Sequence, residues 1–279
     1  MRLVLQGAAI RTPHLQHIHQ LCGVTSSFMQ IAEHAYYLQV SAIEFTEVKT
    51  FCNEQNIDCA LVDDKQRLSN FGLCVMDMDS TLISIECIDE IADLAGLKPQ
   101  VAAITESAMR GEIDFAESLK KRVALLVGLE ESALHRVVDE RLKLNPGATE
   151  WIDTCKKFGI TTMLVSGGFT FFADKVKEML GLDDAISNTL EIIDGKLTGK
   201  ILGNIIDAQA KADHLLKLRD KLGLSVSQTI AIGDGANDLK MMRVAGVGVA
   251  YHAKPVVQQQ STYALNFVGL EGVIGLFTV

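Results

Sequence analysis

The fold is decided by residues 73–82, which read LCVMDMDSTL. The four apolar residues Leu73–Met76 show no polar alternation, which is typical of a strand covered by helices on both faces. Asp77 and Asp79 follow directly, so two carboxylates stand where the expected strand ends. Such a pair can act as nucleophile and general acid/base when its surroundings keep one group ionised and the other protonated. An Asp-rich turn at a strand end is the plainer alternative.

Three further apolar runs have the same texture, at Ile160–Val165, Thr229–Ile232 and Val247–Val249. Each ends in a polar turn that precedes a helical pattern, so we predict an α/β fold with a doubly wound parallel sheet. Ligands of such sheets bind at the carboxyl ends of the strands. Asp194-Gly195, between two apolar segments, predicts a β-hairpin.

Small and hydroxyl residues follow the second apolar run, where residues 165–169 read VSGGF. Ser166 and Gly167 would let backbone N–H groups approach an oxyanion at the start of a helix. An ordinary glycine-rich turn between a strand and a helix explains the same pattern.

Oxygen ligands follow the third run, where residues 232–239 read IGDGANDL. Asp234, Asn237 and Asp238 place two carboxylates and an amide within five positions, a density that suggests Mg²⁺. A capped turn is the alternative. Lys211, at the start of a helical segment, could neutralise a phosphate, although a solvated helix lysine is its ordinary role.

The chain divides into three predicted parts. Residues 85–145 are dominated by helical periodicity and exceed the dozen or so residues that a crossover needs, so we predict an inserted helical cap. Residues 71–84 and 146–279 form the predicted catalytic α/β core. Residues 1–66 form a small N-terminal α+β domain, with a polar linker at 63–70.

The N-terminal part has no catalytic constellation. Phe28, Ile31 and Ala32 stand at helical spacing, which predicts a helix there. Three nearby histidines lack cysteine or acidic partners at metal-finger spacing, so we expect no metal at His14, His17 and His19. Dimer contact, ligand binding and scaffolding stay open for this part.

Composition narrows the range of partners. The 279 residues are 48% hydrophobic and carry a formal net charge of −9, which disfavours a nucleic-acid partner. No run approaches the roughly 18–20 apolar residues of a membrane helix. Six scattered cysteines predict reduced thiols and a cytoplasmic protein. We expect a monomer or homodimer with a small-molecule substrate.

Taken together, the motifs resemble a known family. Asp-x-Asp-Ser-Thr, Ser-Gly-Gly-Phe, an intervening Lys and Gly-Asp-Gly-Ala-Asn-Asp stand in the order and spacing of the four motifs of the haloacid dehalogenase superfamily. The resemblance covers residues 71–279. In their full form the motifs are most similar to those of members that act on phosphoserine.

The resemblance implies a two-step phosphoryl transfer that depends on Mg²⁺. Asp77 would attack phosphorus to form an aspartyl-phosphate, and Asp79 would protonate the leaving oxygen and then activate water. The Asp77 carboxylate, the Asp79 backbone carbonyl and Asp234 would hold the metal. Such a site works because positive charge cancels the repulsion between a phosphate and a carboxylate nucleophile.

Matching positions also imply the residues that hold the phosphate. Ser166, the Gly167 N–H group and Lys211 would bind it. Asn237, also counted among the substrate-binding residues, and Asp238 would orient the waters of the metal and Lys211.

The cap would choose the substrate. Phosphoserine carries an ammonium and a carboxylate, and the family's acid and base fall on Glu86 and Arg122. The family's cap aromatic falls on Phe115, which would exclude water when the cap closes. Taken singly, these residues are better explained as a helix acid, a solvated arginine and a core phenylalanine.

The expected activity is Mg²⁺-dependent hydrolysis of O-phospho-L-serine to L-serine and phosphate, the last step of serine biosynthesis. The enzymatic alternative is a phosphatase or phosphotransferase for another small phosphomonoester, such as phosphohomoserine. The alternative from another class is a phospho-signalling receiver, which also combines clustered aspartates, a hydroxyl residue and a lysine.

Overall fold

A computed structural model describes residues 1–41 and 43–278. Its larger sheet has seven strands in the order β11-β10-β9-β5-β6-β7-β8, and all neighbours pair in parallel except β7 and β8. The strands are β5 (Leu73–Met76), β6 (Thr161–Phe169), β7 (Asp184–Ile193), β8 (Lys196–Leu202), β9 (Thr229–Gly233), β10 (Val247–Tyr251) and β11 (Tyr263–Leu265). The predicted parallel α/β sheet is confirmed, and so is the hairpin at Asp194-Gly195, which joins β7 to β8.

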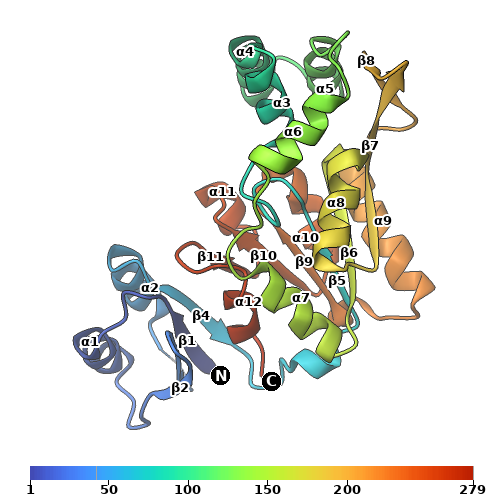
Figure 1. Ribbon diagram of the computed structural model, residues 1–279. Helices are drawn as coiled ribbons and strands as arrows, with labels where there is room; N and C mark the ends of the chain where they lie inside the picture. The colour runs from blue at the N-terminus through green and yellow to red at the C-terminus, as the bar shows by residue number, and fades with distance from the viewer. Residues whose placement is uncertain (42, 279) are drawn as a thin grey trace.

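Helices cover both faces of this sheet (Figure 1). They are α7 (Ala148–Lys157), α8 (Thr170–Leu180), α9 (Ala208–Lys221), α10 (Leu239–Val244), α11 (Pro255–Gln258) and α12 (Gly272–Gly275), with short 3₁₀ turns η1 (Leu68–Asn70), η2 (Val226–Gln228) and η3 (Ala236–Asp238). Because successive strand residues face opposite sides, Met76 joins the core cluster of α7 and α8, and Val75 joins that of α9 and α10. The run of apolar residues in β5 follows from burial on both faces.

Four helices between β5 and α7 stand over one end of the sheet (Figure 1). They are α3 (Cys87–Leu94), α4 (Lys98–Met109), α5 (Phe115–Ala124) and α6 (Ser132–Glu140). The chain enters and leaves this group through two paired connections. Ser84 N donates to Lys143 O at 2.9 Å, and Asn145 N donates to Leu82 O at 2.9 Å. The two connections therefore form a short antiparallel hinge.

The β7–β8 hairpin also touches the helical group. Gly128 N donates to Leu197 O at 2.8 Å, and Leu197 N donates to Leu129 O at 2.9 Å. The helices are thus tied to the sheet at a second place.

The N-terminal segment forms a separate antiparallel sheet in the order β2-β3-β1-β4. Its elements are β1 (Arg2–Gln6), α1 (Thr12–Cys22), β2 (Met29–Ala32), β3 (Ala35–Gln39), α2 (Phe45–Glu54) and β4 (Asp58–Val62). The helix predicted at Phe28, Ile31 and Ala32 is wrong. Those positions run into the exposed edge strand β2, which pairs with β3, so neighbouring backbone overrides the apolar spacing.

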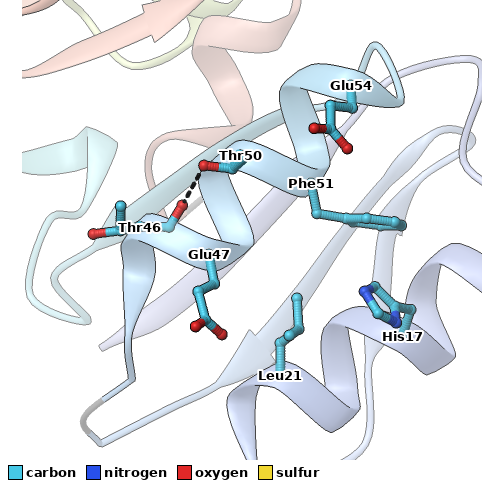
Figure 2. Close-up of a pocket in the computed structure, with 7 residues that line it drawn as sticks. All are labelled: His17, Leu21, Thr46, Glu47, Thr50, Phe51 and Glu54. Atoms are coloured by element: carbon cyan, nitrogen blue, oxygen red, sulfur yellow. Dashed lines mark hydrogen bonds between the residues drawn. The ribbon is translucent and has the colours of Figure 1, made fainter.

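Residues of α1 and α2 line a hollow between these two helices (Figure 2). The His17 ring lies 4.4 Å from the Phe51 ring, centroid to centroid, and His14 is 6.2 Å from the same ring. His19 Nε2 lies 2.8 Å from Ser26 O. His14 and His17 therefore both contact Phe51, whereas His19 contacts the Ser26 backbone.

The N-terminal sheet is fastened to the C-terminal part of the chain. The buried Asp58 carboxylate accepts the backbone N–H groups of Asn266, Phe267 and Val268 at 2.7, 2.8 and 3.1 Å. The segment 63–70 is correspondingly short and anchored, since Leu68 is buried and its N–H donates to Thr278 O.

Two further properties bear on the predicted setting of the protein. Within residues 1–41 and 43–278, no helix has the length and apolar character that crossing a bilayer requires. The six cysteines all lie in this part of the chain and are free thiols.

Candidate active site

The two aspartates that follow β5 lie at its carboxyl end, where the chain leaves the sheet. Asp77 is 4% exposed, and its Oδ1 accepts the Met78 N–H at 2.7 Å. Asp79 Oδ1 accepts the Cys87 N–H at 2.9 Å, and its Oδ2 accepts the Ser166 hydroxyl at 3.4 Å. Hence the two carboxylates have different surroundings, as an acid and a nucleophile require.

The surroundings of Asp79 favour its protonated form. Burial foremost, and then the charge of Asp77, raise the pKa of Asp79 to about 6, although the Cys87 N–H bond opposes the shift. A carboxyl group in that range can both donate and accept a proton near neutral pH.

Lys211 lies buried beside Asp77. Its Nζ is 2.7 Å from Asp77 Oδ2 and 2.7 Å from Asp238 Oδ1, and the side chain is 1% exposed. The lysine sits in the first turn of α9, which Asp207 caps by accepting two backbone N–H groups. Burial alone would lower the pKa of Lys211, but the two carboxylates outweigh it and raise the pKa. Lys211 is therefore a buried cation that fixes Asp77.

The loop after β6 brings a hydroxyl and two glycines to the same place. The Gly168 N–H donates to Ser166 Oγ at 2.8 Å, which orients the hydroxyl. A Cβ at Gly168 would lie 2.5 Å from Asp79 Oδ2, and one at Gly167 would lie 2.8 Å from Phe115 Cζ. A side chain at Gly168 would therefore crowd the loop that carries Asp79, and one at Gly167 would crowd Phe115 of α5.

The loop after β9 supplies a third set of oxygen atoms. Asp234 Oδ1 accepts the Thr81 hydroxyl at 3.2 Å, and Asp238 Oδ2 accepts the Gly235 N–H at 3.0 Å. Carboxylate oxygens of Asp77, Asp234 and Asp238 all lie within 4.8 Å of one another. This is an acidic cluster of a size that can hold a metal ion.

Crowding of these acids changes their protonation. Burial, followed by the charge of Asp77, raises the pKa of Asp234 to about 6 and that of Asp238 to about 7. A cation in the cluster would relieve the repulsion that contributes to both shifts.

A cavity of about 740 Å³ lies between the carboxyl ends of the strands and the helical group above them. Most of the predicted site residues line it, namely Asp77, Asp79, Glu86, Phe115, Arg122, Ser166, Gly167, Asp234 and Asn237. Lys211 and Asp238 do not, since they lie buried beneath Asp77. The structure thus brings all eleven positions into one region, nine at the cavity wall and two behind it.

The cavity wall carries one acid and one base away from the aspartate pair. Glu86 faces the cavity and its Oε1 accepts the Ser80 hydroxyl at 2.7 Å. Loss of surrounding water, followed by the charge of Asp79, raises the pKa of Glu86 to about 8. Burial lowers the pKa of Arg122, against the opposing charge of Asp89. A ligand that carries an opposite charge for each residue would relieve both effects.

Two polar residues that the sequence analysis did not identify, Asn188 and Asn145, hold the backbone around the site. Asn188 is 1% exposed, donates from Nδ2 to Gly167 O at 2.8 Å and accepts the Ile206 N–H on Oδ1 at 2.8 Å. Asn145 donates from Nδ2 to Thr81 O and Ile83 O across the hinge. Neither belongs to a motif, and Asn188 stands between the polar residues Ser187 and Thr189, so no sequence pattern singles it out.

The site combines an aspartate pair, a buried lysine and an acidic cluster at one end of a parallel sheet, beneath a helical insertion. This combination is typical of a hydrolase that acts on phosphate esters. The chain belongs to the haloacid dehalogenase-like hydrolases, whose family model matches residues 71–246. This assignment confirms the resemblance deduced from the four motifs.

Proteins named as phosphoserine phosphatases match between three quarters and nearly all of the chain. A phosphoserine phosphatase of Haemophilus influenzae is 47% identical over 277 residues, which cover 99% of this chain and 88% of that protein. The unliganded structure of a probable phosphoserine phosphatase from Vibrio cholerae is 42% identical, with a TM-score of 0.87, over 99% of this chain and 85% of that one. A substrate-bound phosphoserine phosphatase complex is 38% identical, with a TM-score of 0.70, over 75% of this chain and 99% of that one.

Proposed function

We propose that this chain hydrolyses O-phospho-L-serine to L-serine and phosphate, the last step of serine biosynthesis. The observation that carries the proposal is the single cavity in which the Asp77 and Asp79 pair shares a wall with Glu86 and Arg122. Phosphoserine presents an ammonium suited to Glu86 and a carboxylate suited to Arg122. Its phosphate would lie at the Asp77 and Asp79 pair, where the buried Lys211 and a metal ion would offset the negative charge. The names of the relatives support the same substrate.

In the first step, an Asp77 carboxylate oxygen forms a bond to phosphorus while the bond from phosphorus to the serine oxygen breaks. Asp79 gives its proton to that oxygen, and its raised pKa supports this role. Ser166 and the Gly167 N–H bind phosphoryl oxygens, and Lys211 offsets their charge. In the second step, Asp79 takes a proton from water, whose oxygen bonds to phosphorus as the bond from phosphorus to the Asp77 oxygen breaks, which frees the Asp77 carboxylate and phosphate.

The acidic cluster fits a magnesium ion. In our proposal the Asp77 carboxylate, the Asp79 backbone carbonyl and Asp234 would hold Mg²⁺, which would supply positive charge against the phosphate. Asp238 belongs to the cluster by distance, but unlike Asp77 and Asp234 it is fully buried behind the cavity wall, where it pairs with Lys211 and the Gly235 N–H. That pairing supports a role for Asp238, with Asn237, in orienting its neighbours.

Removing divalent metal should therefore abolish turnover. After treatment with EDTA, the rate of phosphate release is expected to fall by at least about 10²-fold and to return with Mg²⁺. Added Mg²⁺ should also raise the melting temperature of the metal-free protein, because it relieves repulsion among the clustered carboxylates. Full activity after chelation, with no thermal shift, would contradict the metal assignment.

Asn188 offers a test of how the backbone of residues 166–168, which is proposed to bind the phosphate, is held in place. Asn188→Ala should weaken inhibition by inorganic phosphate and lower kcat/KM for L-phosphoserine by about tenfold, because the Gly167 peptide loses its anchor. The matched control is Asn70→Ala, an exposed asparagine remote from the cavity. An unchanged inhibition constant for phosphate in a folded Asn188→Ala protein would remove this role.

The substrate assignment is tested with a panel of L-phosphoserine, phosphohomoserine, phosphothreonine and an aryl phosphate. We expect L-phosphoserine to give the highest kcat/KM. Arg122→Ala should lower that value by about 10²-fold, since a charge-assisted bidentate contact is lost, and should leave the aryl phosphate nearly unchanged. Lys120→Ala, an exposed lysine of the same helix, is the control. A higher kcat/KM for phosphohomoserine would contradict the substrate assignment but leave the proposed mechanism of phosphoryl transfer unchanged.

Three further parts of the proposal concern organisation. The separate N-terminal sheet with its own core cluster supports a boundary after residues 1–66. The four-helix insertion supports dividing the rest into residues 71–84 with 146–279 and the cap at residues 85–145. In this division Phe115, on the inner face of the cap, shields the reaction from water. The free thiols support a cytoplasmic location, and the enzyme acts as a monomer or homodimer. Membership in a hydrolase family disfavours the receiver alternative.

A further inference from the structure

Helix α5 turns one face toward the cavity. Phe115, Ser118, Leu119 and Arg122 all line it, at the spacing of residues that share one side of a helix. Phe115 and Arg122 already have proposed roles, and Leu119 is apolar. Ser118 is the polar residue of this face that the reaction scheme leaves without a use.

The side chain of Ser118 is 2% exposed, and its hydroxyl has no hydrogen-bond partner among the described residues. Arg122 Nε, one helical turn further on, is buried and unpartnered in the same way. Buried polar atoms without partners are uncommon, because each loses its bonds to water and gains none in return. Ser118 Oγ and Arg122 Nε are two such atoms on one helix face, and both belong to residues that line the cavity. They indicate that a ligand group in the cavity supplies their hydrogen-bond partners.

The chemistry of that group follows from its neighbours. A hydroxyl and a guanidinium can both donate hydrogen bonds, and an ionised carboxylate accepts several at once. Glu86, which suits an ammonium group, lies at the start of α3 and not on α5. The α5 face therefore matches an anionic group.

We propose that Ser118 is a specificity residue whose hydroxyl donates to the substrate's α-carboxylate beside Arg122. This inference rests on the proposed function, since it assigns a further contact in the same pocket. The hydroxyl contributes to recognition of the amino-acid part and takes no part in phosphoryl transfer.

The test compares the parent enzyme with Ser118→Ala, using Ser132→Ala, an exposed serine of the cap, as the control. The measurements are kcat/KM for L-phosphoserine and the competitive inhibition constants of two truncated phosphates. Phosphoethanolamine lacks the carboxylate, and 3-phosphooxypropanoate lacks the ammonium.

Ser118→Ala should lower kcat/KM for L-phosphoserine by about tenfold, mainly through KM, as expected for one charge-assisted hydrogen bond. The substitution should raise the inhibition constant of 3-phosphooxypropanoate by a similar factor. The inhibition constant of phosphoethanolamine should stay within about twofold of the parent value. Unchanged binding of phosphoethanolamine also shows that the variant is folded.

The opposite pattern, in which only phosphoethanolamine weakens, would assign the hydroxyl to the ammonium and overturn the proposal. Equal values for parent and variant on all three compounds would overturn it as well. If the parent enzyme fails to hydrolyse L-phosphoserine, the proposed function fails and this inference falls with it. If the parent hydrolyses L-phosphoserine and the variant matches it, only the inference fails.

Discussion

Replacing Asp77 with Asn is expected to lower kcat for L-phosphoserine by at least about 10⁴-fold, the scale of losing a nucleophile. The substitution keeps the volume of the side chain but removes the charge that attacks phosphorus. Lys211 then keeps only one of its two carboxylate partners, Asp238.

The fold should survive this change. Asp77 lies in an acidic cluster, so losing its charge reduces repulsion with Asp234 and Asp238 while it weakens one ion pair. We expect a melting temperature near that of the parent protein. Residual activity above about one hundredth of the parent, with a cooperative melting curve, would assign the nucleophile to another group.

Lys211→Met should have the second largest effect, on both rate and stability. The substitution leaves Asp77 and Asp238 facing each other without the buried cation, and breaking such a pair costs about 3–5 kcal/mol of unfolding free energy. The rate should fall by at least about 10³-fold, because the phosphate loses a compensating charge.

Chemical denaturation and phosphate release measure the two effects separately. Lys217→Met, an exposed lysine of the same helix, should change neither. A Lys211→Met protein with parent-like stability and rate would show that the lysine neutralises neither carboxylate nor phosphate.

The sheet could be predicted because its strands are buried on both faces. The run Leu73–Met76 became β5 with the same limits, since burial selects apolar residues at every position. The strand expected to end at Val165 instead continues to Phe169, where it pairs with Asn188. Pairing with a neighbour decides such ends, and a single segment of sequence does not contain the neighbour.

The edge strand β2 shows the same limit. Met29–Ala32 is exposed throughout, so no burial pattern marks it, and the helical spacing nearby was misleading. Its strand conformation comes from pairing with β3.

The candidate site could be predicted because each motif follows a strand of one parallel sheet. Carboxyl ends of such strands meet at one edge, which explains why Asp77, Ser166 and Asp234 line a single cavity. Asn188 and Ser118 could not be predicted in this way. The importance of Asn188 depends on its hydrogen bond to Gly167 O, and that of Ser118 depends on a buried hydroxyl without a partner in the described part of the chain. Only the packed structure reveals either feature.

The most direct test is to quench the enzyme with acid during turnover of L-phosphoserine with Mg²⁺ and to locate bound phosphate by mass spectrometry. We predict a phosphoryl group on the peptide that contains Asp77, with L-serine and phosphate released in equal amounts. Asp77→Asn should show neither the phosphorylated peptide nor product. Phosphate on another residue, or turnover of L-phosphoserine by Asp77→Asn at the parent rate, would contradict the account.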